Sequence, residues 1–247
     1  MKISIITASF NSAKTIRDTL ETVKYQDYHD VEHIVIDGLS SDETLNIVRK
    51  YPNIAKVISE KDKGIYDAMN KGLQLATGEV IGILNSDDMY VDSKVLQDVM
   101  EIFSNDSIDG CYADLQYVDE VNTGKLVRNW KSGTYNKNSF LYGWMPPHPT
   151  LFLRRRVYDK VGFFNLAFKT AADYELMLRI FVRHNFNIQY LPRVIVKMRT
   201  GGASNSSVWH RIHANKEDRM AWKINNLKPY FFTLYMKPLR KIFQFIN

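Results

Sequence analysis

Short apolar runs alternate with amphipathic stretches through the first ninety residues. The apolar runs are rich in β-branched residues and are typical of buried strands: residues 2–9, 31–37, 55–59 and 80–84. The stretches between them repeat apolar residues at helical spacing: residues 12–25, 40–50 and 64–75. Ser12 fits an N-cap for the first helix, and Ser40 with Glu43 fits a capping box for the second. The alternation predicts an α/β fold, a Rossmann-like doubly wound, mostly parallel sheet with helices on both faces.

The alternation loosens after residue 92. Helices are predicted over residues 93–103, 154–161, 173–184 and 206–225, and strands over 110–114, 126–130, 150–153, 188–191 and 194–198. Residues 136–149 contain one glycine and three prolines, a composition that is typical of a loop. We therefore predict one α/β domain over residues 1–205, divided at residue 92 into two halves, with a helical and amphipathic extension over residues 206–247.

Composition bounds the class of protein. A chain of 247 residues with 45% apolar and 24% charged residues can bury a full core. Its single cysteine, Cys111, excludes an internal disulfide and fits a reducing compartment. The first ten residues fit a strand better than a secretory signal, and no apolar run approaches the roughly 18 residues of a spanning helix. We expect a cytoplasmic protein.

Charge is distributed unevenly along the chain. Residues 1–125 hold 12 Lys and Arg against 22 Asp and Glu, a net −10, while residues 126–247 hold 21 against 5, a net +16. The basic half suits an anionic surface or a phosphate-bearing ligand, although a basic surface also serves solubility alone.

Two adjacent carboxylates follow the fourth predicted strand, in the stretch EVIGILNSDDMYVD. Asp87 and Asp88 would lie at the carboxyl edge of the sheet, where open α/β folds bind ligands. A carboxylate pair there suits a divalent cation carrying phosphate. Adjacent acids in a loop are often only structural, but their position after an inner strand favours the metal.

Four segments together resemble the nucleotide-sugar-dependent glycosyltransferases of the GT-A fold, in particular the large inverting family 2, whose bacterial members build cell-envelope polysaccharides. The segments are ITASFN, VIDGLSSDET, EKDKGIYDAMNKGLQLATGEVIGILNSDD and TAADYELMLR. The resemblance is dense over residues 3–92 and moderate over 145–185. It implies that residues 1–92 bind the nucleotide and that residues 93–205 receive the acceptor.

The resemblance also implies which residues bind the donor. They are Thr7, Ala8, Phe10 and Asn11 at the first strand end, Asp37 facing the base, Asp62, Gly64, Asp67 and Asn70 along the nucleotide and sugar, and Asn85 with Ser86. The helix starting at Gly64 can receive a diphosphate at its N-terminal amides. Phe10 could equally belong to the core, and Asp37 could be a turn residue.

The metal motif departs from the family pattern. ILNSDD matches D-x-D with Asn85 in place of the usual first Asp, which puts Asp87 and Asp88 on Mn²⁺ or Mg²⁺. Neutral Asn85 can still bond a ribose but lowers the local negative charge.

Asp173 is the candidate general base, because it resembles the acidic residue that opens the family's acceptor-side helix. A carboxylate that takes the proton of an attacking hydroxyl contributes roughly 10²- to 10⁴-fold to the rate. Helix capping is the alternative explanation of Asp173, and Glu175 is the substitute base.

Two further groups belong to an acceptor site or lid. His148, in MPPHPT, resembles a polar position near the acceptor or leaving phosphate, or is structural. Arg199, Gly201 and Gly202 resemble a loop that closes on the diphosphate.

The last twenty residues mix aromatic and aliphatic clusters with four cations: Lys228, Lys237, Arg240 and Lys241. This composition suits a membrane interface. Packing on the domain, or a homodimer interface, explains it equally well.

The sequence thus predicts a metal-dependent inverting glycosyltransferase that moves a sugar from a nucleotide donor, UDP-sugar favoured by Asp37, to a saccharide or lipid-linked saccharide at the inner face of the cytoplasmic membrane. The alternatives are a sugar nucleotidyltransferase, for which residues 8–15 lack the expected Gly-rich loop with Arg and Lys, and a non-catalytic basic binder of membrane or nucleic acid. Nucleic acid is not expected, because the amino-terminal half is acidic.

Overall fold

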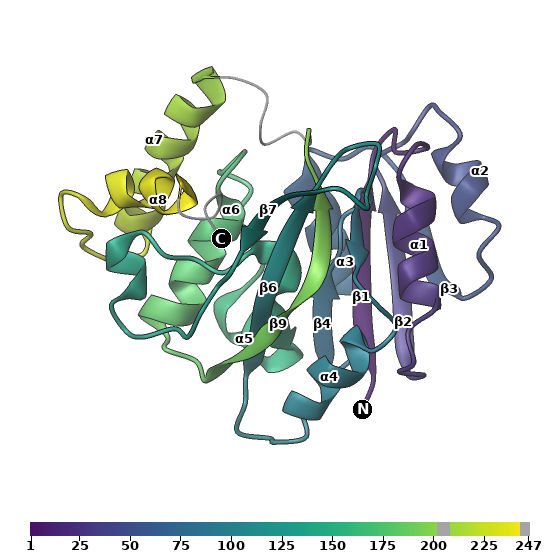
Figure 1. Ribbon diagram of the computed structural model, residues 1–247, viewed down its shortest axis with the longest axis horizontal. Coiled ribbons are helices and arrows are strands. Elements are labelled where there is room, and N and C mark those ends of the chain that lie inside the picture. The colour runs from purple at the N-terminus through teal and green to yellow at the C-terminus, as the bar shows by residue number, and fades with distance from the viewer. Residues whose placement is uncertain (202–207, 243–247) are drawn as a thin grey trace.

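A computed structural model describes residues 1–201 and 208–242, with only the helical backbone for residues 208–215, 241 and 242. One mixed sheet organises it, with strands in the order β3-β2-β1-β4-β8-β6-β9-β5 and with β7 paired to β6 (Figure 1). The strands are β1 Ile3–Ser9, β2 Val31–Asp37, β3 Ile54–Ser59, β4 Val80–Ile83, β5 Asp88–Tyr90, β6 Gly110–Val118, β7 Leu126–Trp130, β8 Phe152–Arg154 and β9 Ile188–Arg199.

The amino-terminal half of the sheet is parallel and the other half is mixed. Strands β3, β2, β1 and β4 pair in parallel. Beyond β4, antiparallel pairs join β8 to its neighbours, and β6 pairs in parallel with β9. The predicted α/β sheet is confirmed, with the right-handed series of crossovers confined to the first half of the chain.

Helices cover both faces of the sheet (Figure 1). They are α1 Ile16–Lys24, α2 Thr44–Val48, α3 Ile65–Leu75, α4 Val95–Ile102, α5 Arg155–Val161, α6 Ala172–Met177, α7 Val208–Ile224 and α8 Thr233–Ile242. A π-helical segment, Leu178–Arg183, continues α6, and short 3₁₀ turns occupy Ser139–Tyr142 and His148–Thr150.

Alternation along each strand divides the core between the two faces. Ile6 and Ala8 pack in one cluster with residues of α3 and α6, whereas Ile3 and Ile5 pack in another with α1 and α4. Successive side chains of a strand point to opposite faces, so a β-branched run without polar breaks is what a sheet covered on both sides requires.

Two helix starts differ from the sequence prediction. Helix α1 begins at Ile16, because the Ser12 carbonyl accepts the amides of Thr15 and Ile16 in a turn before it. Helix α2 has no capping box: the Ser40 amide donates to Asp37 at 2.9 Å, and Asp42 accepts the Thr44 amide at 3.0 Å. Both serines instead hold the loops that follow β1 and β2.

Further differences concern strands. Residues 188–199 form one strand, not two, and β5 was not expected. β5 pairs antiparallel with β9, with Asp88 opposite Met198. This pairing joins the acidic loop to the far end of the chain.

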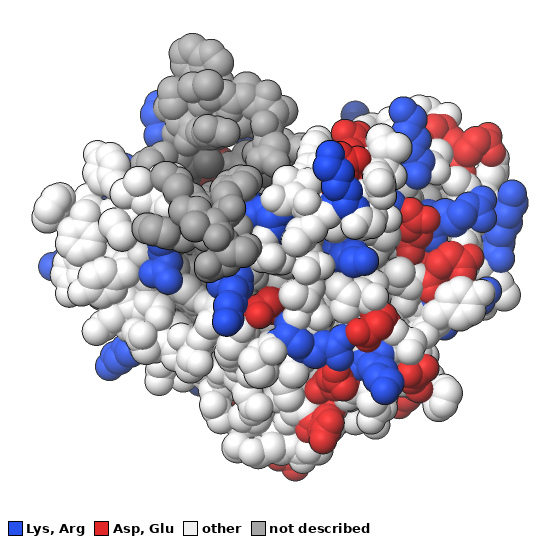
Figure 2. Space-filling view, viewed as in Figure 1, with Lys and Arg blue, Asp and Glu red and all other residues white. Residues whose placement is uncertain are grey.

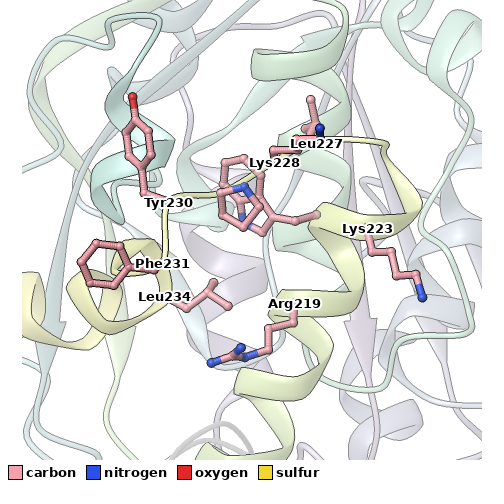
Figure 3. Close-up of a pocket in the computed structure, with 9 residues that line it drawn as sticks. Arg219, Lys223, Leu227, Lys228, Tyr230, Phe231 and Leu234 are labelled. Atoms are coloured by element: carbon pink, nitrogen blue, oxygen red, sulfur yellow. The ribbon is translucent and has the colours of Figure 1, made fainter.

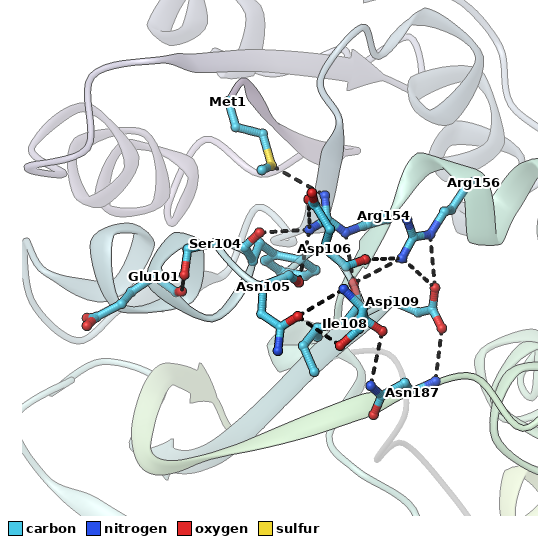
Figure 4. A network of polar contacts seen from close by, with 12 residues as sticks. Met1, Glu101, Ser104, Asn105, Asp106, Ile108, Asp109, Arg154, Arg156 and Asn187 are labelled. Carbon is cyan, nitrogen blue, oxygen red and sulfur yellow. Dashed lines mark hydrogen bonds and ion pairs between the residues drawn. The ribbon is translucent and has the colours of Figure 1, made fainter.

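Buried Arg154 fastens the end of α4 to β8 (Figure 4). Its guanidinium donates to the carbonyls of Phe103 at 2.7 Å and Ile108 at 2.8 Å, and Arg156 pairs with Asp109 at 2.9 Å. The carbonyls at a helix end lack partners within the helix, so Arg154 satisfies them where water is excluded.

The last two helices form a hairpin against α6. Trp222 donates its indole N–H to the Tyr174 hydroxyl at 3.0 Å, and Trp222 and Leu234 belong to the core cluster around α6. One face of the extension therefore packs on the domain, which was the sequence-based alternative to a membrane interface. Within the described residues, no helix combines the length and apolarity needed to cross a bilayer.

Candidate functional site

The candidate site lies along the carboxyl edge of the parallel strands, at the top of Figure 1. The loop after β4 carries the acidic motif, and α1 supports it, because the Thr19 hydroxyl donates to the Asp88 carbonyl at 2.7 Å. The loop after β1 lies beside it, since the Ser12 and Ser86 hydroxyls bond at 2.8 Å, and the loop after β2 lies next to that one, since the Asn11 amide donates to the Ser40 hydroxyl at 2.8 Å. The register of the sheet brings these loops together.

Two buried oxygens in the acidic loop have no partner. Asn85 Oδ1 and Asp88 Oδ1 are both inaccessible and accept no hydrogen bond, while Asn85 Nδ2 donates to the other Asp88 oxygen at 3.3 Å. Buried polar oxygens are normally satisfied, so these two require an explanation. Hard oxygen ligands beside the Asp87 carboxylate fit a divalent cation.

The protein would supply only part of a coordination shell. In the described parts of the chain, no group of three or more His, Cys, Asp or Glu side chains is arranged to hold a metal. Two carboxylates and an amide suit a cation that takes its other ligands from phosphate and water. The donor set thus fits a metal bound together with a nucleoside diphosphate.

Burial and mutual repulsion set the protonation of this loop. Burial raises the pKa of Asp87, and burial together with the Asp87 charge raises the pKa of Asp88. The nearby Arg199 charge opposes both shifts. A cation bound here would relieve the repulsion that raises the pKa of Asp88.

Arg199 lies at the end of β9 and is 6% exposed. It donates to the Asp87 carbonyl at 3.0 Å and pairs with Asp18. The predicted lid residue Arg199 is thus already against the acidic loop. Gly201 is exposed and lies beside Glu120, and Gly202 falls outside the described residues.

A second group of residues surrounds Gly38. A Cβ at this position would lie 3.0 Å from Asp62 Oδ2 and 3.3 Å from the Phe10 ring, so the backbone approaches both side chains closely. The Phe10 ring is 65% exposed, which excludes the core interpretation. An exposed ring beside a carboxylate suits a nucleobase. The sequence analysis did not select Gly38, although a glycine directly after the strand-ending Asp37 was a signal for close approach.

Three predicted base contacts have protein partners in the free protein. Asp37 is fully buried, and its two oxygens accept four bonds, from the hydroxyls of Ser9, Ser40 and Ser59 and from the Ser40 amide. A base would have to replace one of these hydroxyls, since a carboxylate offers about four acceptor positions. Thr7 is buried against His33 at 3.0 Å, and Ala8 is in the core. That Thr7, Ala8 and Asp37 face the base stays a prediction.

Other predicted donor residues shape the loops. Asn11 accepts the Ser41 amide at 2.9 Å, and Asp67 accepts the Lys63 amide at 2.9 Å. Asn70 exchanges two 2.9 Å bonds with the Phe164 backbone, which joins α3 to the loop before α6, and its contact with the donor stays a prediction.

Gly64 precedes α3 with φ of 123°, and a Cβ at this position would have no atom within 4 Å, which leaves the amide edge open. Asp62 is paired with Lys71 at 2.5 Å. The start of α3 is thus accessible beside a carboxylate that a lysine neutralises, as a diphosphate site requires.

Asp173 lies in the first turn of α6, where its carboxylate accepts the Tyr66 hydroxyl at 3.1 Å. Tyr66 comes from the donor-side helix α3 and stacks on Phe164, with ring centres 5.4 Å apart. Burial and the Asp173 charge raise the pKa of Tyr66, so this phenol stays a donor. The two helices therefore meet at the candidate base.

Capping does not explain Asp173. The N-cap residue of α6 is Ala171, which makes no side-chain cap bond, and Glu217 accepts the amides of Lys169, Thr170 and Ala171 before the helix. Glu175, the substitute base, is 2% exposed and pairs with Arg179 at 2.7 Å, so it is unsuited to meet a substrate.

His148 also lies near Asp173. Its ring meets Phe164 edge-on at 5.5 Å. Burial lowers the pKa of His148 while the Asp173 charge raises it. The predicted acceptor-side His148 is therefore close to the candidate base.

Tyr117 lies on β6 near the acidic loop, because Tyr117 and Asp88 both pair with Met198 of β9. Burial raises the pKa of the Tyr117 phenol, the Arg128 charge lowers it, and the charges of Asp88 and Asp173 raise it further. The charges of both carboxylates thus act on the same part of the sheet. The sequence analysis missed Tyr117, because a strand tyrosine carries no signal of its own.

An α/β sheet with acidic, amide and basic groups gathered at its carboxyl edge is the arrangement in which open α/β folds bind their ligands. Residues 4–163 match the family model described as Glycosyl transferase family 2. The chain belongs to this family and is a glycosyltransferase.

Curated relatives agree with the family. A PGL/p-HBAD biosynthesis glycosyltransferase of Mycobacterium bovis is 30% identical over 210 residues, which cover 83% of this chain and 80% of the relative. An uncharacterized glycosyltransferase of Mycobacterium tuberculosis is 33% identical over 180 residues, which cover 72% and 68%.

Solved structures confirm the GT-A fold. The chain is similar to residues 1–349 of Staphylococcus aureus TarS in complex with UDP-GlcNAc, with a TM-score of 0.71 and 21% identity, over 91% of this chain and 65% of that one. It is also similar to the mannosyltransferase PcManGT of Pyrobaculum calidifontis in complex with GDP-Man and Mn²⁺, with a TM-score of 0.68 and 18% identity, over 96% and 68%.

Proposed function

We propose that this glycosyltransferase is metal-dependent and inverting, and that it moves a sugar from a UDP-sugar to a hydroxyl of a saccharide or lipid-linked saccharide in envelope polysaccharide biosynthesis. The observation that carries the proposal is the pair of buried, unpartnered oxygens of Asn85 and Asp88 at the carboxyl edge of the sheet. Residues 1–92 would bind the donor, residues 93–205 the acceptor, and residues 206–247 would form an accessory hairpin.

The donor would lie between the exposed Phe10 ring and the acidic loop. Gly38 and Asp62 would face the base and ribose, and the amides after Gly64 would face the diphosphate. Asp87, Asp88 and Asn85 would hold Mn²⁺ or Mg²⁺, whose charge stabilises the departing nucleoside diphosphate. Arg199 adds a fixed positive charge beside the same loop.

Asp173 would take the proton of the acceptor hydroxyl as that oxygen attacks the anomeric carbon. The hydroxyl of Tyr66 holds one carboxylate oxygen, which leaves the other for the acceptor. The nucleoside diphosphate leaves from the opposite side of the sugar, so the anomeric configuration inverts.

Relatives support the donor and acceptor classes. The TarS structure holds UDP-GlcNAc, PcManGT holds GDP-Man with Mn²⁺, and the mycobacterial relatives are named for PGL/p-HBAD biosynthesis. We retain a UDP-sugar as donor and a lipid-linked saccharide at the inner face of the cytoplasmic membrane as acceptor. Because the relatives' structures hold both UDP and GDP sugars, UDP and GDP must be compared directly.

A thermal-shift titration tests metal-dependent donor binding. UDP and GDP are added with Mn²⁺, with Mg²⁺ or with a chelator, to the wild type and to Asp87→Ala. We expect UDP to raise the melting temperature of the wild type only when metal is present. At a UDP concentration a hundredfold above its dissociation constant, the free energy of unfolding should rise by about 2.7 kcal/mol. Asp87→Ala should abolish this effect. Equal stabilisation with and without metal would refute metal dependence.

Asp173→Asn tests the base separately. This variant should keep the metal-dependent UDP shift and lose transfer by roughly 10²- to 10⁴-fold, measured as sugar moved to an acceptor extract or as slow donor hydrolysis. Asp159→Asn, an exposed change of the same kind, serves as the control. Full transfer in Asp173→Asn would remove Asp173 as base.

A further inference from the structure

The exposed side of the terminal hairpin is basic and aromatic. Residues 219–247 contain six Lys and Arg and no Asp or Glu. Six large apolar side chains on α7, α8 and their connection are solvent-exposed: Met220, Ile224, Tyr230, Phe231, Tyr235 and Leu239. We call this surface the hairpin face.

The other side of the hairpin is fixed to the domain. Trp222 is bonded to Tyr174 and the buried Thr233 hydroxyl donates to the Leu141 carbonyl at 2.6 Å, while Lys237 of α8 pairs with Asp218 of α7 at 2.8 Å within the hairpin. A Cβ on Gly143 would come within 2.4 Å of the Lys237 amide nitrogen, so this loop and α8 are in close contact. The hairpin face is therefore held outward by buried contacts, and its exposure does not come from a loose tail.

A cavity of about 460 Å³ opens on this face (Figure 3). Lys223 and Lys228 line it together with Tyr230 and Phe231, above the Trp222 ring. Phe231 is 89% exposed. Exposing an apolar ring to water is unfavourable in free energy, and binding to an apolar partner would remove that penalty. Cations beside exposed rings suit an anionic headgroup region with its acyl boundary.

Charge on the rest of the molecule agrees with this orientation. On the face in Figure 2, acidic and basic side chains mix over the half with α1, α2 and α4, whereas the coloured part of the side toward α7 and α8 shows mainly uncharged and basic residues. An anionic surface would meet fewer carboxylates on the hairpin side.

We propose that the hairpin face docks this glycosyltransferase on an anionic lipid bilayer, with Phe231 and Tyr230 at the acyl boundary and Lys223, Lys228 and Arg240 among the headgroups. The inference rests on the proposed function, because docking would present the candidate site to a lipid-linked acceptor. Charge complementarity favours this occupant over a second copy of the chain, because two such faces would repel each other.

Docking would bring the acceptor half close to the membrane. Helix α7 provides Glu217, which holds the three amides before α6, and Trp222, which bonds the residue next to Asp173. The candidate base and the hairpin therefore belong to one packed unit.

Vesicle co-sedimentation tests the proposal on the full chain. Vesicles of phosphatidylcholine alone are compared with vesicles containing about 40% phosphatidylglycerol, at 0.1 M and 0.5 M NaCl. We expect binding to the anionic vesicles at low salt, at least about tenfold stronger than to the neutral ones, and its loss at high salt. Binding to neither vesicle, or to both equally, overturns the proposal.

Matched variants locate the surface. Lys223→Glu with Lys228→Glu, and separately Phe231→Ser, should each weaken binding at least about tenfold, while Lys50→Glu with Lys94→Glu and Tyr25→Ser, equally exposed changes elsewhere, should not. The metal-dependent UDP shift must stay unchanged in all four variants, which shows that they are folded and separates this proposal from the proposed function. Dimerisation that Phe231→Ser abolishes, without vesicle binding, would assign the face to a second copy instead.

Discussion

Asp88 combines features that a folded protein normally avoids. It is fully buried, one of its oxygens has no partner, and burial and the Asp87 charge raise its pKa. Its neighbour Asn85 contributes a second unpartnered oxygen. A buried carboxylate whose oxygen lacks a partner lowers the stability of the folded protein. Ionisable groups with pKa values shifted by burial and by a neighbouring charge are characteristic of sites that bind a ligand.

Replacing Asp88 should therefore stabilise the metal-free protein. Because its folded pKa is raised, the folded state binds the proton more tightly, so stability is greatest at low pH and is lost as pH rises through the folded pKa. Asp88→Asn removes this loss, and we expect its melting temperature at pH 7 without metal to exceed the wild type by several degrees. It should show no added stabilisation by Mn²⁺ with UDP.

Scanning calorimetry of apo Asp88→Asn, with Asp159→Asn as control, measures the effect. A lower melting temperature than the wild type would mean that the Asp88 carboxylate has a stabilising partner, contrary to the orphaned oxygen described above.

At the scale of elements, sequence periodicity located most strands and helices but not the hydrogen bonds at their ends. The first four strands followed from runs of β-branched residues, because burial on both faces leaves a strong pattern. Ser40 and Glu43 matched a capping box, yet Ser40 bonds Asp37 instead. Local motifs compete with tertiary partners, and the sequence alone does not show which partner is near.

Some residues of the candidate site could be predicted from the sequence and others could not. Asp87, Asp88 and Asp173 could be selected because adjacent acids after a strand and an acid at a helix start are visible in one dimension. Tyr117 could not, since its position beside Met198, which also pairs with Asp88, depends on the pairing of β6 with β9. The order of the strands along the sequence does not determine which distant strands pair in the sheet.

Glu217 supports α6 from a helix distant in sequence. Its carboxylate accepts the amides of Lys169, Thr170 and Ala171 at 2.8–3.0 Å, next to Asp173. Glu217→Ala should lower stability by about 1–3 kcal/mol, because these amides lose their partner, and should loosen the base. We expect a reduced kcat with an unchanged dissociation constant for UDP, whereas Lys216→Ala, at the adjacent exposed position, should change neither. A weaker UDP affinity would show that the effect spreads to the donor half.

At the scale of the whole molecule, the central strands carry ionisable groups that tie folding to pH. Burial lowers the pKa of His33 on β2 to about 4, and its Nδ1 has no partner. For its neighbour Glu32, burial raises the pKa, but hydrogen bonds from Ser4 and Thr77 lower it to about 2. The two groups titrate in different ranges, so their effects on folding can be separated.

The depressed pKa of His33 predicts acid sensitivity. An unfolded histidine binds a proton near pH 6.5 and the folded one near pH 4, so stability is full above 6.5 and falls as pH drops through this range, by up to about 1.4 kcal/mol per pH unit. His33→Gln removes the titrating group while keeping a polar atom for Thr7. We expect its free energy of unfolding, measured in urea between pH 7 and 4, to fall less steeply than that of the wild type. His29→Gln, at an exposed position on the loop before β2, should retain the wild-type slope, and equal slopes in all three proteins would mean that His33 gains a proton without cost in the folded sheet.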